Sequence, residues 1–372
     1  AEGDEILSIG MLQMKPPKEI ISILPQKCKR TTSFLFLVNN IIWAGHKSLD
    51  KALVDTSLSP LDDCTEDTKF DGWSQTSVFL DSFSAKVAPH GYGRSLNLAM
   101  LLSVLSGTQI SKDSTLTNDQ LHLLVSSNDV IVQRMMTYAT TFYKRCIIYN
   151  EIPSQKEWIK MNGGLIFFRL QATPKKNTVL LEKIIKERTS TVWVLVPSSI
   201  RNMKKDYNKL AYQFDLVVNI DPIYDSKMDT MLSSFILDGY RSSTAGFSVE
   251  SLSQRRSLEV HMTRHAQELI KDYFMAARAR RNSYTFHELE TIARVSRCHC
   301  RLHQRKLVTL LDVFVAIMVV EETMVKKLRR SHMGFVDLEN GNLNVDLQFE
   351  GELPIERFQN FVDQANRFMA NL

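Results

Sequence analysis

LHLLVSSNDVIVQRMM, residues 121–136, passes from a mostly apolar run through polar residues to a second apolar pattern. Residues 121–125 are typical of a buried strand, and residues 130–136 place apolar side chains at helical spacing. Residues 126–129 between them are turn formers. A strand, a turn and a helix in this order are the arrangement in which many nucleotide hydrolases hold a phosphate. Such a loop needs glycines and a lysine, and this turn contains neither.

Strand-like and helical segments alternate on the C-terminal side of this stretch. The strand-like segments are 145–150, 163–168, 191–196 and 214–220, and helical patterns such as residues 177–188 lie between them. Alternation at this spacing predicts an α/β fold, in which a parallel sheet is flanked by helices.

Changes in composition and in hydrophobic pattern divide the chain into six regions. We predict a partial β unit, a polar linker, an α/β core, a serine-rich hinge, a helical lid, and a C-terminal hairpin with a final helix. Their boundaries in the sequence are 1–45, 46–72, 73–238, 239–254, 255–330 and 331–372.

Two helix starts in the predicted lid carry a specific signal, and a further helix is expected over residues 257–279. Thr285 is followed three residues later by Glu288, which makes a capping box in which each side chain satisfies an orphan N–H of the other residue. Thr309 and Asp312 repeat this spacing and predict the start of the next helix.

Composition sets broad limits on the 372-residue chain. Hydrophobic residues make up 44% and charged residues 23%, values typical of a folded protein. The formal net charge of +5 permits nucleic-acid binding without arguing for it. The five cysteines have scattered spacing and are expected to be reduced thiols. We expect neither a membrane span nor a signal peptide, because the sequence lacks the apolar runs that these need.

The order of these segments resembles the ATPase half of the minichromosome maintenance (MCM) family, AAA+ proteins that encircle DNA. Residues 210–237 are similar to the family's segment around its arginine finger, and residues 284–320 to its sensor-2 helix and lid. Residues 161–168 (MNGGLIFF) resemble the lead into the Walker B strand, and residues 89–107 the helix that enters the ATPase core. The first 45 residues resemble the last strands of an N-terminal OB domain.

The resemblance implies that the ATP-handling positions hold unsuitable residues. The phosphate loop falls on Ser126 to Gln133, with Val132 in place of the lysine and Gln133 in place of the metal-binding hydroxyl. Asp129 would put a negative charge among phosphates, at a cost on the order of several kcal/mol.

The other ATP roles are affected in the same way. The Walker B acidic pair falls on Arg169 and Leu170, the arginine finger on Gln213, and the sensor-2 arginine on His287. The resemblance therefore implies a degenerate ATPase with no nucleotide cofactor and no metal.

These losses are similar to those of the divergent MCM-like group used in meiotic recombination. Membership would imply a non-catalytic scaffold subunit, in the nucleus, of a complex that promotes crossover formation by double-strand break repair. The expected partners are other MCM-like subunits, including one that supplies the rest of the OB domain, with DNA as a further candidate. The alternative is a DNA-binding ATPase or helicase subunit whose active site is completed in trans by a partner.

A basic stripe and a Cys/His cluster lie in the predicted lid. Arg294, Arg297, Arg301 and Arg305 follow one another at helical spacing and predict one exposed face. Two interpretations remain open: a solvated face with local ion pairs, or a contact with DNA phosphate or an acidic partner. Cys298, His299, Cys300 and His303 lack the paired spacing of a structural zinc site, so we expect core or surface roles for them.

Overall fold

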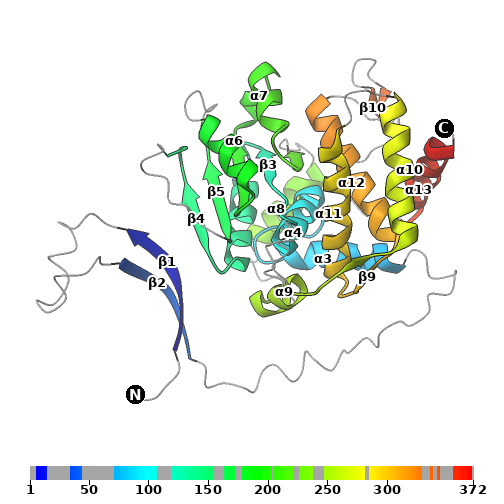
Figure 1. The fold of residues 1–372 in the computed structure, drawn as a ribbon. Coiled ribbons are helices and arrows are strands. Elements are labelled where there is room, and N and C mark those ends of the chain that lie inside the picture. The colour runs from blue at the N-terminus through cyan, green and yellow to red at the C-terminus, as the bar shows by residue number, and fades with distance from the viewer. Residues whose placement is uncertain are drawn as a thin grey trace, which may run out of the picture. The chain divides into compact units, whose positions relative to one another are not determined.

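The computed structural model describes residues 6–14, 34–43, 71–106, 119–153, 163–171, 178–202, 204–220, 226–237, 247–280, 285–328, 336–337, 342–343 and 355–370. The chain divides into two units, residues 1–68 and 69–372. In the first unit, β1 (Ile6–Met14) pairs antiparallel with β2 (Phe34–Trp43), with a register shift after Ile9. The predicted β unit therefore contains a pair of strands (Figure 1), and its membership of an OB domain stays a prediction.

The second unit is built on a sheet of five parallel strands, as predicted (Figure 1). The sheet order is β4-β5-β6-β3-β7. The strand bounds are β3 (Leu123–Ser126), β4 (Cys146–Tyr149), β5 (Leu165–Arg169), β6 (Thr191–Val196) and β7 (Leu216–Asn219). From β3 the chain goes to the outer strand β4 and returns through β5 and β6, and it then passes β3 to form β7. The direction of winding thus reverses beside β3, which makes this the topological switch point of the sheet.

Apolar side chains fill both faces of the sheet, because successive residues of a strand point to opposite sides. One face contributes residues such as Leu123 and Trp193 to the larger core cluster. The other face contributes Leu124 and Val194 to a second cluster, which is covered by α6 (Thr178–Glu187) and α7 (Lys204–Ala211). Burial on both faces explains why these strands read as continuous apolar runs.

The larger cluster joins the sheet to most of the helices in the second unit. It includes residues of α3 (Asp71–Ser84), α4 (Arg94–Leu105), α5 (Val130–Ala139), α9 (Val249–Arg256), α10 (Arg264–Arg280), α11 (Phe286–Leu302), α12 (Leu310–Leu328) and α13 (Ile355–Ala370). Leu232 of α8 (Ser226–Leu237) packs against its edge. The predicted C-terminal helical region therefore shares one hydrophobic core with the sheet.

Helix α12 covers the free edge of β7. The hydroxyl of Thr323 accepts a 3.3 Å hydrogen bond from the backbone N–H of Val217, and Nζ of Lys327 donates a 2.7 Å bond to the carbonyl oxygen of Phe214. Exposed strand edges invite unwanted pairing with other chains. Side chains of α12 satisfy edge groups of β7 that a sixth strand would otherwise have to pair.

Both predicted helix caps are present. Thr285 and Glu288 form the capping box of α11, and the carboxylate of Asp312 accepts a 2.8 Å hydrogen bond from the backbone N–H of Thr309, just before α12. The last predicted hairpin is represented by the antiparallel pair β10 (Val336–Asp337) and β11 (Asn342–Leu343).

The start of the helical region differs from the prediction. The predicted hinge, residues 239–254, contains the beginning of α9, whose N-cap Ser248 accepts from the N–H of Ser251. The helix expected from residue 257 begins only at Arg264, because the chain first forms β8 (His261–Met262), which pairs with β9 (Leu307–Val308). Among the described helices, none has an apolar stretch that could cross a membrane.

Candidate functional site

The turn between β3 and α5 lies at the carboxyl edge of the sheet beside the switch point, where open α/β sheets usually bind ligands. Asp129 is the N-cap of α5, and its carboxylate accepts a 2.7 Å hydrogen bond from the N–H of Ile131. The hydroxyl of Tyr92 donates to the same carboxylate. The N–H of Asp129 donates to the hydroxyl of Ser127 at 3.0 Å. Side chains of the same chain therefore take up hydrogen-bonding groups of this turn.

A neighbouring loop is fastened to the same turn. The side-chain oxygen of Asn128 accepts a 3.1 Å hydrogen bond from the N–H of Ser198, which follows β6. The hydroxyl of Ser126 is buried and has no hydrogen-bond partner among the residues that the structure describes. The predicted lysine position, Val132, is buried in the larger core cluster, and Gln133 is half-buried on α5. A side chain at position 132 thus points into the core and away from the turn.

The predicted Walker B residues lie on the same edge of the sheet but on another strand. Arg169 ends β5 and donates a 3.4 Å hydrogen bond to the side-chain oxygen of Asn150. Leu170 is buried in the second core cluster. Strand β6 separates β5 from β3, so these two positions are not adjacent to the Asp129 turn. Gln213 lies in the turn that precedes β7, where its N–H donates to the carbonyl oxygen of Leu210.

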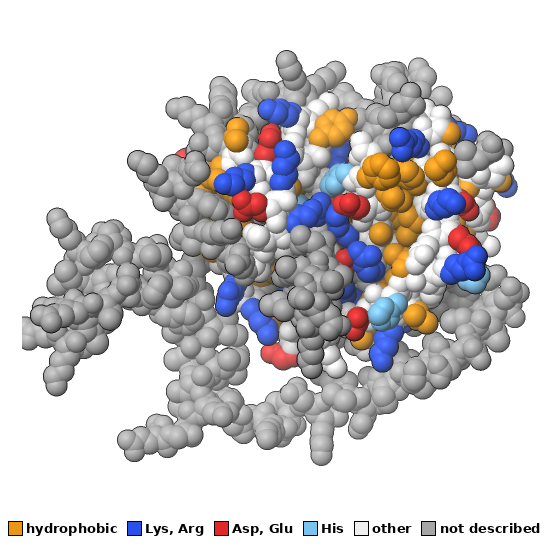
Figure 2. Space-filling view, viewed as in Figure 1, with side chains coloured by type: hydrophobic (Ala, Val, Ile, Leu, Met, Phe, Trp, Pro, Cys, Tyr) orange, Lys and Arg blue, Asp and Glu red, His pale blue; other side chains and the backbone are white. Residues whose placement is uncertain are grey.

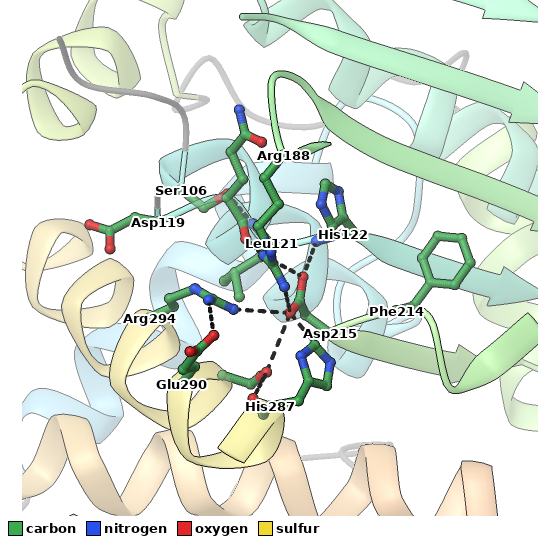
Figure 3. A network of polar contacts seen from close by, with 12 residues as sticks. Ser106, Asp119, Leu121, His122, Arg188, Phe214, Asp215, His287, Glu290 and Arg294 are labelled. Carbon is green, nitrogen blue, oxygen red and sulfur yellow. Dashed lines mark hydrogen bonds and ion pairs between the residues drawn. The ribbon is translucent and has the colours of Figure 1, made fainter. Parts of the chain in front are cut away.

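The opposite, amino edge of the sheet holds a buried polar network around Asp215 (Figure 3). Asp215 precedes β7 and accepts a 2.8 Å hydrogen bond from the backbone N–H of His122, which precedes β3. The guanidinium of Arg188 reaches both carboxylate oxygens, at 2.9 and 3.3 Å. Arg188 adopts a positive φ of 46°, a conformation uncommon for a residue with a side chain, just before β6.

Helix α11 contributes the remaining partners of this network. Arg294 and the hydroxyl of Thr291 each lie 3.3 Å from Oδ1 of Asp215, and Nε2 of His287 lies 3.7 Å from it. Arg294 also pairs with Glu290 on its own helix. The structure thus places His287, the predicted sensor-2 position, against Asp215 and at the other end of β3 from the Asp129 turn.

The network shifts the pKa values of its members. Burial would raise the pKa of Asp215, but the positive charge of Arg188 and the nearby imidazoles of His122 and His287 hold it below its usual range. Burial lowers the pKa of His122 to about 4 and outweighs the opposing effect of Asp215. Burial also lowers the pKa of His287. His122 is therefore neutral near pH 7, and its Nδ1 accepts a 3.1 Å bond from the N–H of Val192.

The expectation that the four arginines form one exposed face is wrong. Arg294 and Arg301 are only 7% and 2% exposed. Arg301 and Arg297 both donate to the buried carboxylate of Asp119, the former at 2.8 Å. Arg305, which lies beyond the end of α11, pairs with Asp312 at 2.6 Å.

Most of the acidic partners of these arginines lie outside α11. Asp119, Asp215 and Asp312 all lie outside α11, so the pattern of residues along its stripe, where Glu290 pairs with Arg294, gave no sign of them. The pairs with Asp119 and Asp215 hold α11 against the segments that lead into β3 and β7, and Asp312 joins the loop after α11 to the first turn of α12. These four guanidinium groups are therefore directed at carboxylates of their own chain.

The cluster of cysteines and histidines is also part of the interior. Cys298 and Cys300 are buried free thiols, and burial raises the pKa of each to about 12. His299 is fully buried, and its ring centroid lies 4.7 Å from that of His303. Within the described part of the chain, no group of three or more ligating side chains is placed to hold a metal ion.

Thr76, His299 and Asp312 have the atomic arrangement of a nucleophile, a base and an orienting acid. Nδ1 of His299 lies 2.6 Å from Asp312, and Nε2 lies 3.0 Å from the hydroxyl of Thr76 on α3. All three residues are fully buried. A substrate cannot reach the hydroxyl in this state, so the arrangement joins α3, α11 and α12 and does not form a reaction centre.

Comparisons with family models and with curated proteins give no family assignment for this chain. No protein-family model matches the chain, and no curated protein matches it significantly.

Proposed function

We propose that this protein is a non-catalytic, MCM-like scaffold subunit of the AAA+ type, which acts in a nuclear complex that promotes meiotic recombination and crossover formation. The observation that carries the proposal is the turn between β3 and α5. The α/β architecture with its helical region is present, and the turn at its switch point is occupied by the carboxylate of Asp129. The specific process rests on the family resemblance of residues 210–237 and 284–320.

Electrostatics explains why this turn is unsuited to a triphosphate. A helix N-terminus attracts anions because its first N–H groups have no partner within the helix. Here Asp129 already supplies the anion, and Tyr92 donates to it from the loop before α4. A phosphate at this turn would meet a carboxylate within a few ångströms, at a cost on the order of several kcal/mol.

The proposal assigns contact with DNA to the partners of this chain. Arg294, Arg297, Arg301 and Arg305 are engaged with Asp215, Asp119 and Asp312. The scaffold would instead assemble with other MCM-like subunits, one of which supplies the rest of the OB domain.

Calorimetric titration of the purified chain with ATP and magnesium tests the non-catalytic part. The expected result is no binding at micromolar affinity and no phosphate release, both for the natural sequence and for Asp129→Asn. Magnesium-dependent turnover that disappears on changing residues of this turn would overturn the proposal.

Native co-purification with identification of the partners tests the scaffold part. Related MCM-like chains are the expected partners, and their absence would contradict the assembly. Adding such a partner also tests the alternative of an ATPase completed in trans. That alternative predicts turnover by the mixture that is lost when Arg169 or Gln213 of this chain is changed and not when the exposed residue Lys183 is changed.

A further inference from the structure

An apolar strip runs along the outer surface of α10 and α11. It consists of Met275 on α10 and of Phe286, Leu289 and Ala293 on α11. Met275 is 50% exposed and Phe286 is 64% exposed, whereas Leu289 and Ala293 are partly buried against the core. Figure 2 shows hydrophobic side chains gathered over α10 and beside α11. Contiguous exposed apolar surface of this kind often marks an interaction site.

The geometry of the strip suits a partner helix. Phe286, Leu289 and Ala293 follow one another by three and four residues, so they lie on one side of α11 over about two turns. A partner helix that lies along such a strip would use apolar residues with the same spacing. Met275 adds a flexible side chain that can adapt to the partner's surface.

A preformed aromatic and cationic cluster holds Phe286 in place. Its ring stacks on that of Phe274, with centroids 5.7 Å apart. The guanidinium of Arg278 lies 5.7 Å from the centre of the Phe286 ring and 5.9 Å from that of Phe274. A ring that is already held by its neighbours loses little freedom on binding, and aromatic and arginine side chains together are frequent in binding hot spots.

The charges beside the strip favour an acidic partner. The carboxylates of Glu268 and Glu290 are engaged by Arg264 and Arg294. Among the other exposed side chains described around Met275, this leaves the cations Lys271 and Arg278 on α10 against the carboxylate of Asp272. Complementary charge on a partner would therefore be negative.

We propose that the strip is a docking site for an amphipathic helix of a partner protein, whose apolar face is flanked by aspartate or glutamate. The inference is independent of the proposed AAA+ scaffold role, because it uses no residue of the Asp129 turn. A protein helix is favoured over single-stranded nucleic acid, since three of the four strip residues are aliphatic side chains, which provide no platform for base stacking.

Fluorescence anisotropy with three labelled probes tests the proposal on the purified full chain. The first probe is a short amphipathic peptide with leucines on one face and glutamates beside them. The second carries lysine in place of every glutamate, and the third is oligothymidylate. We expect the acidic peptide to bind more tightly than the basic one and oligothymidylate to bind weakly.

Substitutions then locate the binding surface. Phe286→Ala should weaken binding of the acidic peptide about ten-fold, whereas Val179→Ala, which changes an exposed valine on α6, should leave it unchanged. Reversing both cations, Lys271→Glu with Arg278→Glu, should invert the preference between the two peptides. Thermal unfolding of each variant checks that it is folded.

The proposal is overturned if neither peptide binds, if both bind equally, or if Phe286→Ala has no more effect than Val179→Ala. Tight binding of oligothymidylate that depends on Phe286 would show a nucleic-acid surface and would also overturn it.

Discussion

Arg301 donates a 2.8 Å hydrogen bond to Asp119, a residue 182 positions earlier in the chain. Both side chains are buried, and Arg297 donates to the same carboxylate. Asp119 opens the segment that enters β3, the strand that lies between β6 and β7 beside the switch point. Helix α11 therefore holds this strand through charge as well as through apolar packing.

Arg301→Gln should lower the free energy of unfolding by about 3 kcal/mol, because it leaves part of the buried Asp119 charge uncompensated. Urea denaturation measures the change. Arg264→Gln is the matched control, since Arg264 pairs with Glu268 at the surface, and its loss should cost less than about 1 kcal/mol. Equal effects of the two substitutions would contradict an interior role for Arg301.

Asp129→Ala should destabilise the protein by about 1 kcal/mol, because the first turn of α5 loses its cap. Asp129→Asn should change stability much less, since the amide oxygen can still accept from the N–H of Ile131. Denaturant unfolding of the two variants gives the comparison. If alanine were as stable as asparagine at this position, the carboxylate would have no capping role.

Thr76→Val should cost about 1–3 kcal/mol, because a buried imidazole nitrogen loses its hydrogen-bond partner. The Thr76 hydroxyl lies 3.0 Å from Nε2 of both His299 and His303. Valine keeps the shape of the side chain and removes the hydroxyl that makes this link, whereas Thr76→Ser keeps the hydroxyl and should be milder. Thermal unfolding distinguishes them, and a serine variant no more stable than valine would count against the link.

The strands could be predicted from the sequence, but their order could not. Strand β6 was predicted with its observed bounds, residues 191–196, because burial on both faces leaves a continuous apolar run. The reversal of winding beside β3 depends on which way each connection crosses the sheet, and local patterns do not specify that. The start of α10 was placed too early, because residues 257–263 fit a helical pattern although β8 pairs with β9.

The candidate site was predicted in part. Turn-forming residues correctly indicated a turn at Asp129, and the capping box correctly marked the start of α11. Periodicity placed the arginines of α11 on one side of the helix but could not show what lies against that side. Buried Arg301 and Arg294 pair with single carboxylates in distant loops, Asp119 and Asp215. Neither carboxylate belongs to a recognisable motif.

The native protein should lose stability as the pH falls from about 6.5 to about 4, because of His122. Its pKa drops from 6.5 in the unfolded chain to about 4 in the native state, owing to burial. Between these pH values His122 is protonated in the unfolded chain and neutral in the native state. The free energy of unfolding therefore falls by up to roughly 3 kcal/mol in total. His303, whose pKa is also lowered by burial, acts in the same direction. His122→Asn keeps an acceptor for the N–H of Val192 and should reduce the slope between about pH 4 and pH 6.5, whereas the exposed control His265→Asn should keep it. Urea denaturation across this range measures both slopes, and an unchanged slope in His122→Asn would show that His122 is not the group responsible.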